Sequence, residues 1–134
     1  MLASVRRLIL TSLFLSPAIV ACGADNPSSD TATETSSEPS RSIEIAAAEY
    51  TFSGEPGVIG AGDTIEFVLA NVGQLDHSLE VLSPTGGSLG VTERIPAGAR
   101  GSVTVTFGDA GVYRLICDVD DHFSRGQGGT VTVT

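Results

Sequence analysis

The stretch Gly111-Val-Tyr-Arg-Leu-Ile-Cys117, followed by Asp118-Val-Asp-Asp-His122-Phe-Ser-Arg-Gly-Gln127, decides the fold of this 134-residue chain. Its first seven residues are rich in β-branched and aromatic side chains, a composition typical of a β-strand. Alternate side chains of a strand share a face, so Tyr113, Leu115 and Cys117 point to the same side. If Leu115 points into a core, Cys117 does so too, at the point where the strand ends.

Similar short segments with a period of two occur throughout the chain after Arg41. They include Ile43 and Ile45 with their polar neighbours, and residues 64–70, 77–82, 101–107 and 129–134. Turns rich in Gly and Pro separate them, and no stretch of ten residues shows a helical pattern. A segment of this length holds one core. The sequence therefore predicts an all-β domain with the fold of a Greek-key β-sandwich or barrel.

Four potential metal ligands lie in two places in the sequence. Four residues separate Cys117 from His122, and four separate His122 from Gln127, while His77 begins another expected strand. Antiparallel pairing places the end of one strand beside the start of the next, so His77 and Cys117 are expected at one pole of the sandwich. A thiolate, two imidazoles and a weak fourth donor form the set that selects copper for electron transfer. Considered alone, Cys117 could be explained as a buried free thiol, and His77 as a histidine of the core or of a turn. Together at one pole they favour a single copper ion.

Residues 42–134 resemble the cupredoxins, the small blue copper proteins of the plastocyanin and azurin superfamily. The resemblance rests on segments 73–78, 95–101, 110–117 and 122–133, and its most specific feature is the Cys-x4-His spacing after Gly-x-Tyr. It implies an eight-stranded Greek-key sandwich with copper near one pole. It also implies that His77, Cys117 and His122 are the equatorial ligands.

Two positions depart from the family pattern. Gln127 stands where most bacterial members with this loop have Met, whereas the stellacyanin-like group uses Gln, so its amide oxygen is the expected axial donor. The alternatives are a surface Gln with three-coordinate copper, or a backbone carbonyl in the axial position. Ser78 replaces the usual Asn after the first His. The resemblance implies that its backbone N–H still bonds the ligand sulfur, but that its side chain ties the two ligand loops together less strongly.

The first forty residues have the composition of a targeting segment and a tether. Arg6 and Arg7 precede a short apolar run, and Ile19-Val-Ala-Cys22 resembles a lipobox, so residues 1–21 are predicted to be a lipoprotein signal peptide. Cys22 would then carry the lipid anchor, and residues 22–41, rich in Ser, Thr and acidic residues, would form a disordered tether. The alternatives are an ordinary signal peptide, or a disulfide between Cys22 and Cys117.

The charge of the chain restricts the classes of partner. Residues 41–134 hold five arginines, no lysine and twelve acidic residues, a formal charge of −7. Nucleic acid is disfavoured as a partner because a basic surface is absent. A redox protein with a basic docking surface, such as a cytochrome, is favoured. Asp76, Asp118, Asp120 and Asp121 form either a docking patch at the predicted pole or a solvated acidic rim, and Phe123 is either the apolar centre of the patch or a core anchor.

The function predicted from these observations is that of a monomeric, lipid-anchored electron carrier in the periplasm or at the cell surface, with one Cu(I)/Cu(II) ion. The alternative is a copper-binding or delivery protein in the same compartment. Delivery proteins usually show open sites rich in Met or His, and this chain has one Met, its first residue. An enzyme is not expected, because no histidine remains for a second copper site.

Overall fold

The computed structural model describes residues 38–134, and this part of the chain consists of strands, turns and loops without a helix. None of the described residues therefore forms a helix that could cross a membrane. The expected signal peptide, Cys22 and the expected tether up to residue 37 lie outside the described residues. The first strand begins at Arg41.

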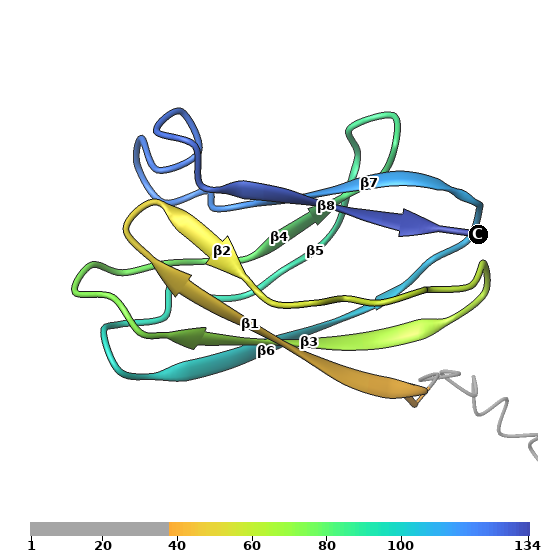
Figure 1. Cartoon of the computed structure of the whole chain (residues 1–134), viewed down its shortest axis with the longest axis horizontal. Helices are drawn as coiled ribbons and strands as arrows, with labels where there is room; N and C mark the ends of the chain where they lie inside the picture. The colour runs from red at the N-terminus through yellow and green to blue at the C-terminus, as the bar shows by residue number, and fades with distance from the viewer. Residues whose placement is uncertain (1–37) are drawn as a thin grey trace, which may run out of the picture. The chain divides into compact units, whose positions relative to one another are not determined.

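Eight strands form two four-stranded sheets that lie face to face (Figure 1). The strands are β1 (Arg41–Ala48), β2 (Thr51–Ser53), β3 (Thr64–Asn71), β4 (Glu80–Leu82), β5 (Ser88–Val91), β6 (Arg100–Thr106), β7 (Gly111–Ile116) and β8 (Gly128–Val133). One sheet has the order β2-β1-β3-β6, and the other has the order β5-β4-β7-β8. β1 and β3 pair in parallel, whereas the other paired strands are antiparallel. The predicted all-β sandwich is confirmed.

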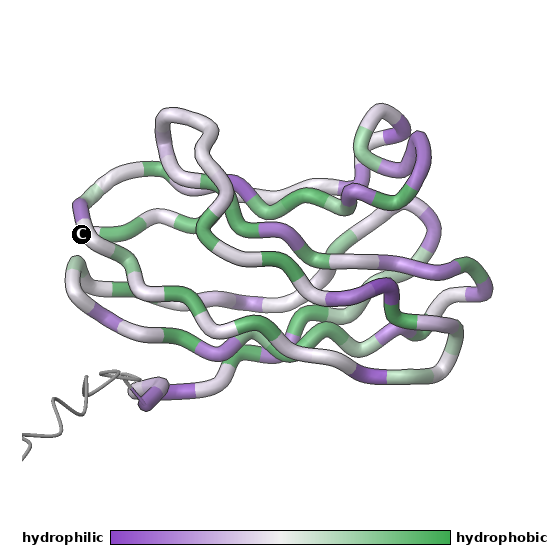
Figure 2. The backbone as a smooth tube through the Cα atoms, turned by 180° about the vertical axis from the view of Figure 1, so that it is seen from behind, coloured by the Kyte–Doolittle hydropathy of each residue, from purple (hydrophilic) through white to green (hydrophobic). Residues whose placement is uncertain are grey.

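The core lies between the two sheets and follows the alternation of the sequence. Hydrophobic and hydrophilic residues alternate along the strands in Figure 2. In β7, Tyr113 and Leu115 are buried, whereas Val112 and Arg114 are exposed. Cys117 follows directly after β7 and is buried as well. The expectation that Cys117 shares the inward face of Leu115 is therefore confirmed.

The segment 77–82 is less regular than the sequence predicts. β4 covers only its last three residues, and His77 forms an isolated antiparallel bridge with Ile95 through hydrogen bonds of 3.1 and 2.7 Å. The backbone N–H of Ser78 donates to the Cys117 sulfur, and that of Leu79 donates to the Thr92 hydroxyl. Because side chains take these two N–H groups, a continuous strand ladder cannot form here.

Both ends of the described domain lie at the same end of the sandwich. The backbone N–H of Ser40 donates to the Thr64 carbonyl at 2.7 Å, where β3 begins, and that of Thr134 donates to the nearby Ile59 carbonyl at 3.0 Å. The loops 71–79 and 117–127 lie at the other end (Figure 1). The polarity of the strands thus separates the ends of the described domain from the loops that carry the potential ligands.

Candidate metal site

Three side chains that can bind a metal come together at one end of the sandwich. The ligand atoms of His77, Cys117 and His122 all lie within 4.8 Å of one another. His77 and Cys117 are fully buried, and His122 is 4% exposed. Among the described residues, no other group of three His, Cys, Asp or Glu side chains offers such a cluster. The three donors are therefore placed for one ion.

Hydrogen bonds at the base of its loop hold Cys117 in position. Its backbone N–H donates to the Gln127 carbonyl at 3.2 Å, which extends the β7–β8 pairing by one residue pair. Its sulfur accepts the Ser78 backbone N–H at 3.5 Å. The expected backbone link to the ligand sulfur is thus present in the structure.

His122 is held by the turn that follows Cys117. Its backbone N–H donates to the Val119 carbonyl, and its own carbonyl accepts the Gln127 N–H, both at 3.0 Å. Nδ1 of the imidazole lies 3.6 Å from the Cys117 sulfur. The Tyr50 ring and the imidazole pack edge to face, with ring centres 5.0 Å apart. These contacts fix the ring with Nδ1 directed at the thiol.

The imidazole of His77 is buried without a hydrogen-bond partner on either nitrogen. Its pKa is lowered, first by burial and second by the nearby His122, while Glu49 and Gln127 act in the opposite direction. Burial disfavours the protonated form of a histidine. The ring is therefore held neutral, which is the form that binds a metal.

The amide of Gln127 has a fixed orientation. Its Nε2 donates to the carbonyls of Ala48 at 3.1 Å and Thr51 at 3.3 Å. Its Oε1 is buried and has no hydrogen-bond partner. The side chain also lies close enough to raise the pKa of His77. The amide nitrogen thus faces the β1–β2 turn. The amide oxygen, which has no hydrogen-bond partner, faces His77.

Within residues 38–134, the buried side-chain nitrogen and oxygen atoms that lack a hydrogen-bond partner are all at this site. Among the described residues, the buried side-chain nitrogen and oxygen atoms without a hydrogen bond are Nδ1 and Nε2 of His77 and Oε1 of Gln127. A buried polar atom without a partner typically costs about 1–3 kcal/mol. Three such atoms beside a thiol and a second imidazole indicate a ligand that supplies the missing contacts.

The Ser78 side chain, expected to tie the ligand loops together less strongly than the usual Asn, takes part in a link between them. Its hydroxyl donates a short hydrogen bond to the Asp118 carboxylate and accepts the Asp118 backbone N–H at 3.1 Å. A serine side chain is short, but Asp118 reaches toward it from the other loop. The two ligand loops are therefore tied together through Asp118, a partner that the resemblance did not name.

Sequence reasoning missed Glu49, which follows the end of β1. Its Oε1 accepts the backbone N–H groups of Gln74 at 2.5 Å and Leu75 at 2.8 Å. The Leu75 and Gln74 N–H groups are the main cause that lowers the pKa of Glu49 to about 2. The same oxygen lies 3.7 Å from Nε2 of His77. No motif links Glu49 to the 71–79 loop, because the contact spans twenty-eight positions and depends on the register of β1.

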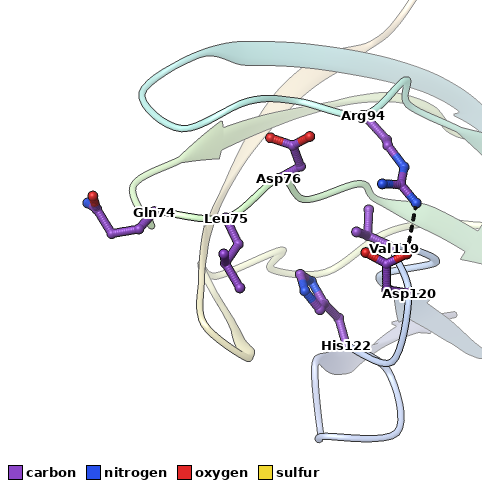
Figure 3. Close-up of a pocket in the computed structure, with 7 residues that line it drawn as sticks. All are labelled: Gln74, Leu75, Asp76, Arg94, Val119, Asp120 and His122. Carbon is purple, nitrogen blue, oxygen red and sulfur yellow. Dashed lines mark hydrogen bonds and ion pairs between the residues drawn. The ribbon is translucent and has the colours of Figure 1, made fainter.

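A shallow cavity of about 300 Å³ opens beside His122 (Figure 3). Leu75 and Asp76 line one side of it, and Arg94 and Asp120 line another. Arg94 pairs with Asp120 at 3.3 Å, as the dashed line in the figure shows. Of the three potential metal ligands, His122 is the one that lines this cavity.

Four acidic residues were expected at this pole, and two of them form ion pairs with arginines. Asp120 pairs with Arg94, and Asp121 pairs with Arg125 at 2.8 Å. Arg125 also lies over the Tyr50 ring, 4.7 Å from its centre. Phe123 is 48% exposed. The rim is thus a mixture of ion pairs, carboxylates without an ion pair and exposed apolar side chains.

No protein-family model matches the sequence, and a search of the curated proteins found no match. The structure is similar to auracyanin B, with a TM-score of 0.65 and 21% identity over 72% of this chain and 91% of that one. It is also similar to auracyanin A, a "blue" copper protein from Chloroflexus aurantiacus, with a TM-score of 0.60, 19% identity and coverage of 69% and 98%. A chain of a heme-copper terminal oxidase matches with a TM-score of 0.54, 19% identity and coverage of 70% and 64%. These likenesses show that the domain has the Greek-key sandwich fold of the cupredoxins.

Proposed function

We propose that this protein is a mononuclear type 1 copper protein that carries single electrons between protein partners. The observation that carries the proposal is the buried cluster of His77, Cys117 and His122, whose ligand atoms lie within 4.8 Å of one another. One soft thiolate and two imidazoles are the donor set of blue copper electron-transfer sites. The likeness to the auracyanin structures supports the same assignment.

The residues around the cluster fit a copper ion. His77 offers an unpartnered buried nitrogen, and Gln127 offers an unpartnered buried oxygen as the weak axial donor. When bound, the ion would take up and release one electron between its Cu(I) and Cu(II) states. The chain holds the donors in nearly fixed positions through the bonds at the base of the 117–127 loop. A rigid donor set that suits both states keeps the structural change on electron transfer small.

Burial of the site supports a route for the electron through His122. His77 and Cys117 are fully enclosed, whereas His122 lines the cavity at the surface. A partner that docks over this cavity comes closest to the ion through the His122 ring. We infer a carrier rather than an enzyme, because both histidines of the chain belong to this one site and none remains for a second metal.

The partner and location belong to the proposal as well. The charge of −7 over residues 41–134 favours a redox partner with a basic docking surface. Exposed Leu75 and Phe123 give the same pole an apolar component. The lipobox at Cys22 supports a lipid anchor on the extracytoplasmic face of a membrane, with the domain acting as a monomer.

The visible absorption spectrum of the copper-loaded, oxidised protein tests the proposal. We expect an intense thiolate-to-copper charge-transfer band and stoichiometric binding of one ion. The zinc-loaded protein is the matched control, because it fills the same ligands without such a band. Weak, reversible copper binding without the band would refute the electron carrier and favour a copper-delivery protein.

A further inference from the structure

We propose that Glu49 is a positioning residue for the His77 ligand and that its charge holds the reduction potential of the site low. The inference rests on the proposed copper function and extends it to a residue outside the ligand set. Oε1 of Glu49 lies 3.7 Å from Nε2 of His77, a ring that is fully buried. Among the described residues, this is the one carboxylate with an oxygen within 4.0 Å of a ring nitrogen of a histidine in the cluster.

The 71–75 loop is shaped to hold this carboxylate. The N–H groups of Gln74 and Leu75 both donate to Oε1. A Cβ atom at Gly73 would lie 2.5 Å from Oε1 and 2.8 Å from Oε2, so the carboxylate occupies the space that a side chain would need. The Asn71 side chain accepts the Gly73 N–H at 2.9 Å and fixes the turn. The position of the carboxylate is therefore built into the loop.

The contact selects which nitrogen of His77 is available to a metal. A carboxylate that faces Nε2 favours the tautomer with its proton on Nε2, which leaves the lone pair on Nδ1. Nδ1 is buried and has no partner of its own. At 3.7 Å the contact is longer than a hydrogen bond, so its effect is mainly electrostatic. The charge of Glu49 makes the imidazole a better donor.

A better donor and a nearby negative charge both favour the more highly charged state of a bound ion. Cu(II) is therefore stabilised relative to Cu(I), and the reduction potential falls. The same contact strengthens binding of any divalent ion at the cluster, since carboxylate partners of metal-bound histidines typically contribute 10–100-fold to affinity. These two consequences can be measured separately.

Two variants remove the contact in different ways. Glu49→Gln removes the charge but keeps an oxygen that can accept the N–H groups of Gln74 and Leu75. Gly73→Ala keeps the charge and displaces the carboxylate. Asp76→Asn is the matched control, because it removes one charge at the same pole from an exposed carboxylate that lines the cavity. Circular dichroism checks that each variant is folded.

The experiment has a zinc arm and a copper arm. In the zinc arm, competition titration should show at least tenfold weaker Zn²⁺ binding for Glu49→Gln and Gly73→Ala than for the wild type and Asp76→Asn. In the copper arm, the reduction potentials of the same two variants should rise by about 59 mV. For a one-electron couple, this shift corresponds to a tenfold change in the redox equilibrium constant. Wild-type zinc affinity in Glu49→Gln would overturn the inference. If the wild type shows no blue band but zinc binding depends on Glu49, the positioning role stands and the electron-carrier function fails.

Discussion

Replacing Gln127 with Met tests the axial position and has two separable effects. An amide oxygen is a harder donor than a thioether and favours Cu(II), so Gln127→Met should raise the reduction potential by tens of millivolts. A tenfold change in the redox equilibrium corresponds to about 59 mV. The charge-transfer band should persist, because the thiolate and both imidazoles are unchanged.

The second effect of Gln127→Met is on stability. The substitution removes the hydrogen bonds from Nε2 to the Ala48 and Thr51 carbonyls. At about 0.5–1.5 kcal/mol for each bond, the free energy of unfolding of the metal-free domain should fall by about 1–3 kcal/mol. Urea denaturation of the metal-free protein measures this loss, and redox titration of the copper protein measures the potential.

Gln127→Leu is the matched control. It loses the same two hydrogen bonds but offers no axial donor, so its stability should equal that of Gln127→Met and its potential should be higher still. Equal potentials for Gln, Met and Leu at position 127 would show that this side chain does not bind the ion. A backbone carbonyl from the loop before His77 would then be the axial candidate.

Four further predictions concern the thiolate, the anchor, the partner and the response to acid. Cys117→Ser should abolish the blue band while the metal-free domain stays folded, since the core consists of other side chains; retained colour would refute the ligand assignment. Cys22→Ala should release the protein from membranes, because stable anchoring needs more than one acyl chain; continued membrane fractionation would contradict the lipobox. The association rate with a cationic redox partner, measured by stopped flow, should fall as added salt shortens the Debye length from about 30 Å to about 8 Å. An association rate that does not change with salt would favour an apolar docking face. Because the pKa of His77 is lowered on folding, the unfolded chain binds the proton more readily, and the free energy of unfolding of the metal-free domain should decrease as the pH drops below about 6.5. The pKa of Glu49, lowered from 4.5 to about 2, should add a second loss between those pH values that Glu49→Gln removes; constant stability from pH 7 to 3 in urea titrations would refute both.

The local part of this structure was predictable from sequence. Alternation in 111–117 predicts a strand that ends with an inward Cys117, because side chains along a strand must alternate. The spacing from Cys117 to His122 and Gln127 lies within one loop, and the structure places these donors on one short connection between β7 and β8.

The contacts around the ligands were not predictable in the same way. Glu49 reaches His77 because β1 pairs in parallel with β3. The register between two distant strands cannot be predicted from the sequence of either strand alone. The Ser78–Asp118 link joins residues forty positions apart. The pairing of Asp120 with Arg94 likewise joins two loops, so an acidic cluster in the sequence became a partly neutralised rim in the structure.

The two ends of the described domain lie at the end of the sandwich away from the ligand loops, and this position has a practical consequence. Ser40 and Thr134 are both held by backbone hydrogen bonds at that end. A protein immobilised on an electrode through Thr134 would present its His122 face to the solution rather than to the solid support. A fusion partner added after Thr134 would leave the same face free for electron exchange, so the orientation on a chip or in a fusion can be chosen without altering the site.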